Sequence, residues 1–189
     1  MTLFEYLTAG FVLILSFAVI RALLGIPHVL HRTSRYWVHV AWLILGLANC
    51  LVTFWAFWSY RDIEWTLPRF IIALGTPATL FVYNSILVPA DPASVPSWRK
   101  HFFDVRISLF VTGAVSVVLI FATNYMILGV SLRHPIVIFC VVWLAIYLVG
   151  LASDNSALHS VLAFAVLSVF AAGILTLFAQ PQSLLQEVP

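Results

Sequence analysis

No charged residue occurs in the stretch PIVIFCVVWLAIYLVGLA, residues 135–152. An α-helix of about 20 apolar residues crosses the ~30 Å hydrocarbon core of a lipid bilayer. Five further stretches are similarly long and apolar, so the sequence predicts six transmembrane helices. The expected spans are approximately Leu3–Leu24, Trp37–Tyr60, Phe70–Val88, Ile107–Leu128, Pro135–Ala152 and Ala157–Ala179.

The composition argues against a soluble fold. Of the 189 residues, 63% are hydrophobic and 8% are charged, whereas soluble domains contain about 25% charged residues. We therefore expect an all-α polytopic membrane protein, a bundle of six transmembrane helices in one domain over residues 1–189, with no room for a soluble catalytic domain. The first span carries Glu5 in place of a basic amino-terminal region, so we expect a retained helix rather than a cleaved signal peptide.

Basic residues are unevenly distributed between the two sides of the predicted bundle. The side of the first, third and fifth connections has six, and the other side has three. The six are Arg21, Arg32, Arg35, Arg99, Lys100 and Arg106, and the three are Arg61, Arg69 and Arg133. Because Lys and Arg accumulate in cytoplasmic loops, the first side is predicted to be cytoplasmic and both termini are predicted to lie outside.

Titratable side chains gather at one depth, just inside the predicted cytoplasmic interface. They are His39, His159, Asp104, Arg106, Asp154 and Arg21. Ionisable groups within a membrane often mark binding sites or proton pathways, so these residues form a candidate polar vestibule for an ion, a proton or a lipid headgroup. In that interpretation His39 and His159 face each other. Snorkelling, helix capping and ion pairing are the structural alternative.

Two amides and a proline interrupt the apolar character of the second and third spans. Asn49 and Asn84 need hydrogen-bond partners in hydrocarbon, so both are expected to face other helices or to line a polar path. Pro77 removes a backbone hydrogen bond and is expected to kink its helix, either as a structural bend or as a hinge. These three residues are candidates for a pore or for helix contacts.

Five aromatic residues in the second span form a candidate contact site for an apolar ligand. They are Trp42, Phe54, Trp55, Phe57 and Trp58. A lipid, a quinone or a pigment could bind such rings. Packing within the bundle and an aromatic belt at the membrane interface are the alternatives.

The sequence indicates no cofactor, metal site or nucleic-acid partner. Cys50 and Cys140 lie in apolar surroundings and are interpreted as small buried hydrophobic residues. No HExxH motif or carboxylate cluster provides metal ligands. The net charge of +2 is too small and too dispersed for nucleic-acid binding. The expected partners are the lipid bilayer and, in addition, a second copy of the chain or a larger membrane complex.

The middle third of the chain resembles a group of six-span bacterial inner-membrane proteins that has no established activity. The resemblance lies in Tyr36-Trp37-Val38-His39 with Trp42, in Phe54-Trp55 and Trp58, in Trp65-Thr66 with Phe70 and Pro77, and in His101-Phe102-Phe103 with Arg106. It implies a bacterial inner membrane and six spans, and it implies nothing about chemistry.

Three classes of function fit these observations. The first is a channel or transporter for an ion or small solute. The second is a non-enzymatic membrane subunit that binds a lipid, quinone or pigment, or docks on a larger complex. The third is an intramembrane lipid-modifying enzyme that uses His39, Asp104 or His159 as acid or base. Because no nucleophile or metal set completes a catalytic site, we do not expect an enzyme.

The predicted topology can be tested with reporter fusions. A reporter fused at Asp91 is expected to give a cytoplasmic signal, and one fused at the C-terminus is expected to give an external signal, because the basic residues favour that orientation. A cytoplasmic signal from the C-terminal fusion would overturn the topology.

Overall fold

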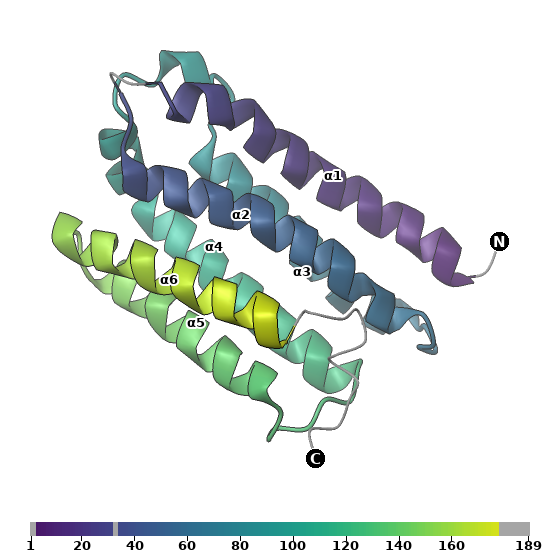
Figure 1. The fold of residues 1–189 in the computed structure, drawn as a ribbon. Helices are drawn as coiled ribbons and strands as arrows, with labels where there is room; N and C mark the ends of the chain where they lie inside the picture. The colour runs from purple at the N-terminus through teal and green to yellow at the C-terminus, as the bar shows by residue number, and fades with distance from the viewer. Residues whose placement is uncertain (1–2, 32–33, 178–189) are drawn as a thin grey trace.

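The computed structural model describes residues 3–31 and 34–177, which form six long helices joined by short connections (Figure 1). The helices are α1 (Leu3–Val29), α2 (Trp37–Ala56), α3 (Leu67–Leu87), α4 (Trp98–Met126), α5 (Pro135–Ala152) and α6 (Ser156–Thr176). The short 3-10 helix η1 (Phe57–Tyr60) continues α2, and η2 (Pro92–Ser94) lies between α3 and α4. The described residues contain no strand, and the predicted all-α bundle of six helices is confirmed.

Each helix is long and apolar enough to cross a bilayer. Only 28% to 44% of the residues in each apolar window are buried inside the protein. The remaining apolar side chains face outward in a continuous surface, which a soluble protein would not expose to water. The chain is therefore a multi-pass membrane protein whose outer surface contacts lipid.

With η1 counted as the end of the second span, the predicted span boundaries agree with the helices to within two residues except at four ends. α1 continues through Pro27 to Val29, and α4 begins at Trp98 rather than Ile107. The α4 extension forms because Ser97 caps the helix, accepting a hydrogen bond from the Lys100 backbone N–H at 3.4 Å. α3 begins three residues earlier than expected, and residues 178–179 of the last predicted span lie outside the described residues.

The six helices pack as one continuous bundle. α1, α2 and α3 pack together, α3 packs closely on α4, α4 packs closely on α5, and α6 packs on both α5 and α2. The α1–α2, α3–α4 and α5–α6 connections lie at one end of the bundle, called here the basic end (Figure 1). α1 begins and α6 ends at the opposite end.

Polar contacts hold the connections at the basic end against the helices. The Trp98 indole donates a hydrogen bond to the His28 backbone oxygen at 2.9 Å, which fastens the end of α1 to the start of α4. The Arg106 guanidinium donates to the backbone oxygens of Gly150, Leu151 and Ser153, at the C-terminus of α5. Because the last carbonyls of a helix have no partner within it and carry partial negative charge, a cation there satisfies and stabilises them.

Two aromatic rings seated on two glycines join α4 to α5. A Cβ atom on Gly150 would overlap the ring of Phe110, and a Cβ atom on Gly113 would overlap the ring of Tyr147. The two rings lie 6.0 Å apart at 70°. Each helix therefore contributes one ring and, three residues further on, one glycine to a reciprocal contact, which brings the two backbones close together.

Substituting Gly150 by alanine tests this contact. G150A is expected to lower the free energy of unfolding by about 1–3 kcal/mol, because the new methyl group displaces the buried Phe110 ring. The control is G10A, where the nearest atom to a new Cβ is Phe70 Cζ at 3.9 Å, an ordinary contact distance. The measurement is the thermal unfolding midpoint of each variant in a mild detergent. Equal midpoints for the two variants would contradict the proposed packing.

Candidate functional site

Two adjoining cavities occupy the half of the bundle that lies away from the basic end. One has a volume of about 40 Å³ and the other about 80 Å³. Asn49, Thr53, Ile120 and Phe139 line both, so the two cavities share a wall. All six helices contribute to the larger cavity, with Phe11 from α1 and Phe170 from α6 at its two sides, and residues of α2 to α5 between.

The cavity walls are mainly apolar, and the polar residues among them are uncharged. Residues with hydroxyl, amide, indole or thiol groups line the two cavities. They are Asn49, Thr53, Tyr60, Thr76, Tyr83, Ser116, Thr123, Asn124, Cys140, Trp143 and Tyr147. Among the described residues that line either cavity, none is a carboxylate, a lysine, an arginine or a histidine. The arrangement can therefore hydrogen-bond a neutral molecule, but it offers no counter-charge to an ion.

Two asparagines among the lining residues each use one amide hydrogen on their own helix. Asn49 Nδ2 donates to the Leu45 backbone oxygen at 3.0 Å, and Asn124 Nδ2 donates to the Ile120 backbone oxygen at 2.8 Å. A backbone oxygen only accepts, so these bonds determine which end of each amide is the nitrogen. Each side chain keeps its carbonyl oxygen Oδ1 and the second hydrogen of Nδ2 for other partners.

Three residues that line the cavities carry a buried polar atom with no hydrogen-bond partner among the described residues. The atoms are Tyr83 Oη, Asn124 Oδ1 and Trp143 Nε1; the residues are 3%, 7% and 4% exposed. An unsatisfied buried polar group costs about 1–3 kcal/mol, and buried polar groups are nearly always paired. Less than 1 Å² of each atom is accessible, so these atoms are enclosed in the packing and do not face the open space of the cavities.

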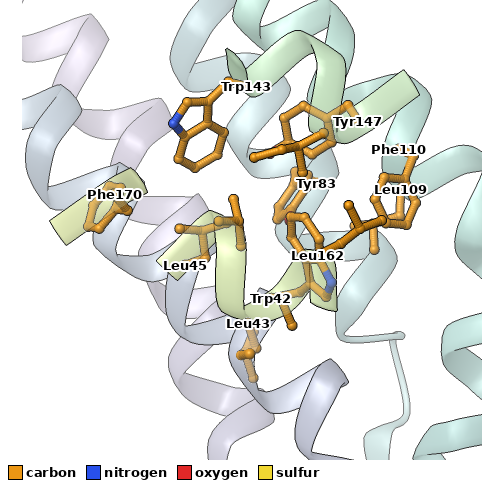
Figure 2. Packing of buried hydrophobic residues seen from close by; sticks show 14 of the residues in the cluster. Trp42, Leu43, Leu45, Tyr83, Leu109, Phe110, Trp143, Tyr147, Leu162 and Phe170 are labelled. Atoms are coloured by element: carbon orange, nitrogen blue, oxygen red, sulfur yellow. The ribbon is translucent and has the colours of Figure 1, made fainter. Parts of the chain in front are cut away.

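A layer of aromatic rings separates the cavities from the basic end. Trp42 packs against Phe110 at 5.1 Å between ring centroids and against Tyr147 at 5.8 Å. Figure 2 shows these rings within the buried cluster, among side chains from several helices. Nearer the basic end, Trp98 and Phe102 are also fully buried. The interior of the bundle near the basic end is consequently filled with large side chains, and the space at that end is an open surface hollow lined by Arg99, Lys100 and Asp154; the two enclosed cavities lie farther along the bundle.

The candidate vestibule residues are divided between separate environments. His39 and His159 are both fully buried, and both pack against the ring of Phe102, at 6.3 Å and 5.2 Å between centroids. His159 Nε2 lies 2.8 Å from the Ser153 backbone oxygen, which also accepts from Arg106. The structure thus brings His159 together with Arg106.

Asp154, although exposed, interacts electrostatically with His159, and the other vestibule candidates do not join this pair. His39 lies against Trp98 and His101, with ring centroids 4.9 Å and 5.7 Å away. Asp104 and Asp154 are exposed, and Arg21 is half-buried on α1. An aromatic ring, rather than an open space, therefore occupies the position between the two groups of titratable side chains.

The pore or helix-contact candidates have different roles in the fold. Asn49 lines both cavities, as described above. Asn84 is fully buried, and its Nδ2 lies 3.1 Å from the Ala18 backbone oxygen and 3.5 Å from Cys50 Sγ, so it links α3 to α1 and α2. Pro77 is buried, and α3 remains helical through it. The Thr79 hydroxyl nearby is 3.2 Å from Ser116 Oγ of α4.

The five aromatic candidates do not form one site. Trp42 is part of the aromatic layer, and Phe57 stacks on Phe11 of α1 at 4.0 Å. Phe54, Trp55 and Trp58 are about half-exposed and face outward. The first two rings pack the interior, and the other three face the surroundings of the bundle.

Sequence reasoning found Asn49 and missed its partners in the cavity walls. Thr53 follows Asn49 by four residues, and on α4 Ser116 precedes Thr123 by seven residues. Residues at these spacings lie on one face of a helix. Small polar residues at helical spacing were therefore a usable signal, whereas the contributions of Cys140 and Trp143 depend on how α5 is rotated.

Comparisons with known proteins give no indication of function, so the function is inferred from the fold and the cavities. No protein-family model, no curated protein and no solved structure matches this chain.

Proposed function

We propose that the protein transports a small uncharged solute across the membrane, without converting it chemically, and binds that solute in the adjoining cavities. The supporting observation is a cavity with no charged residue in its described lining, to which all six helices contribute, in a bundle whose interior near the basic end is filled. Many transporters bind their substrates inside the membrane domain, between helices.

The absence of charge in the described cavity walls favours a neutral solute over an ion. An ion that leaves water for a membrane interior loses several kcal/mol of hydration unless charged or multiple polar groups replace it. Arg106 does not supply a charge to the cavities, because its guanidinium donates hydrogen bonds to backbone carbonyls of α5 at the basic end of the bundle. We therefore propose a neutral solute, where the sequence alone indicated either an ion or a small solute.

The filled half supports transport by alternating access rather than an open pore. For a solute to pass, Trp42 of α2 must separate from Phe110 and Tyr147 of α4 and α5. Rocking of helices about a central site is a known way to accomplish this.

A binding role in a larger complex is the second candidate. The outward-facing rings of Phe54, Trp55 and Trp58 favour it, because exposed aromatic side chains are enriched at protein interfaces as well as in membrane-interface belts. Under that proposal the cavities hold a bound molecule permanently, and no flux occurs. The flux measurement below separates the two roles.

Flux through reconstituted protein tests the transport proposal. Purified protein in liposomes is expected to accelerate the entry of urea or glycerol, followed by light scattering after an osmotic step, and not the entry of K⁺. T53L is expected to slow entry, because Thr53 lines both cavities and the larger side chain fills them. The control is T176L, at an exposed position near the end of α6. If the wild-type protein moves no neutral solute, the transport proposal fails.

The two cysteines provide a second test of the cavities. Cys140 lines the smaller cavity, whereas Cys50 packs between α1, α2 and α3 beside Asn84. In the single-cysteine proteins C50A and C140A, methyl methanethiosulfonate is expected to modify Cys140 at least tenfold faster than Cys50, measured by intact mass spectrometry. T53L is expected to slow modification of Cys140 only. Equal rates for the two cysteines would show that the cavity does not admit small molecules.

A further inference from the structure

The open hollow at the basic end of the bundle brings charges of both signs together at the membrane surface. It has a volume of about 490 Å³ and lies between the first turns of α4 and α6. Because the α6 span begins at Ser156, the hollow lies at the depth of the lipid headgroups. Its lining consists of Ser97, Arg99, Lys100, Phe103, Asp154 and Ser156.

Two cations in this lining are available to an anion. The side chains of Arg99 and Lys100 are exposed, and neither forms an ion pair or a hydrogen bond with another described residue. Ser97 caps α4 through the backbone N–H of Lys100, so the cap does not use the ammonium group. Phosphate oxygens accept charge-assisted hydrogen bonds from guanidinium and ammonium groups. The two side chains therefore suit a phosphate group.

One carboxylate in the same hollow sets a second requirement. Asp154 is exposed, interacts electrostatically with the buried His159, and forms no ion pair with Arg99 or Lys100. The carboxylate repels a ligand whose charge is only negative, whereas an ammonium group can donate charge-assisted hydrogen bonds to it. A ligand with both a phosphate and a primary ammonium group complements all three charged side chains.

The surface next to the hollow is apolar and suits the rest of a lipid molecule. On α4, Ile107 follows Phe103 by four residues, and on α6, Ser160 and Phe164 follow Ser156 at the same spacing. Residues four apart lie on one face of a helix. Ile107 and Phe164 are 60% and 65% exposed, so each row leads from the hollow to outward-facing apolar side chains. Acyl chains can lie along these two rows.

We propose that the hollow binds the headgroup of an aminophospholipid such as phosphatidylethanolamine, with the phosphate between Arg99 and Lys100 and the ammonium group on Asp154. The negative headgroup of phosphatidylglycerol has no cation for this carboxylate, and the quaternary ammonium group of phosphatidylcholine has no N–H to donate to it. The hollow shares no lining residue with the two enclosed cavities, so the proposal does not depend on transport.

Competition among three lipids tests the proposal. The purified protein in mild detergent receives an equimolar mixture of dioleoyl phosphatidylethanolamine, phosphatidylglycerol and phosphatidylcholine, and native mass spectrometry measures the population of each complex. Phosphatidylethanolamine is expected to bind about fivefold more tightly than the other two, the effect of one favourable exposed ion pair. Equal binding of the three lipids, or tighter binding of phosphatidylglycerol, would overturn the proposal.

Substitutions in the hollow assign the two ends of the headgroup. R99Q and K100Q are each expected to weaken phosphatidylethanolamine and phosphatidylglycerol by similar factors, because both lipids carry the phosphate. D154N is expected to weaken phosphatidylethanolamine and strengthen phosphatidylglycerol, so that the preference is lost. The controls are R133Q, exposed in the α4–α5 connection, and D91N, exposed in the α3–α4 connection outside the hollow. A D154N protein that keeps the wild-type preference would exclude the ammonium contact.

Soluble phosphoethanolamine distinguishes a lipid from a free ligand. It carries the same two charged groups and has no acyl chains for the outward faces of α4 and α6. Displacement of bound phosphatidylethanolamine is therefore expected only at a concentration at least about a hundredfold higher than that of the lipid, because buried acyl CH₂ groups add to the affinity of the lipid. Displacement at equal concentrations would assign the hollow to a soluble zwitterion and overturn the lipid proposal.

Discussion

The reciprocal seating of two aromatic rings on two glycines determines how closely α4 and α5 approach. Phe110 occupies the space that a side chain at Gly150 would need, and Tyr147 does the same at Gly113. Trp42 packs on both rings from α2. Because Tyr147 and Gly113 also line the smaller cavity, one contact both joins the helices and separates the cavities from the filled half. The aromatic layer is therefore the boundary between the two halves of the bundle.

The halves differ because their side chains differ in size and polarity. Towards the basic end, indole, phenyl and imidazole rings fill the space between the helices, and their close packing leaves dispersion contacts on every side. In the opposite half, threonine, serine and asparagine project between the helices beside aromatic rings such as Phe11, Phe139 and Phe170. These short side chains fill less space than a ring would, so gaps remain between the helices.

The six helices could be predicted from sequence because a membrane span depends on local length and hydropathy alone. Pro135–Ala152 was predicted to the residue. The start of α4 was placed too late because Trp98 resembles an interfacial anchor, whereas it is 1% exposed and donates to His28 across the fold. Matched depth of His39 and His159 could be inferred, but the ring of Phe102 between their environments could not. Depth follows from position in a span, whereas the facing direction follows from helix rotation.

The three asparagines inside the helices, Asn49, Asn84 and Asn124, show why residue type alone does not identify a site. Asn84 uses its amide nitrogen on the backbone of α1, so it holds α1 and α3 together whatever the state of the other helices. Asn49 and Asn124 use theirs on their own helices, so their carbonyl oxygens keep a fixed direction relative to α2 and α4. An acceptor anchored in this way remains available when helices move apart, because no interhelical bond must break to free it. Within the proposed transport cycle, the bond from Asn84 to α1 keeps α1 and α3 together. The bonds of Asn49 and Asn124 to their own helices keep one polar side chain on α2 and one on α4 when these helices separate.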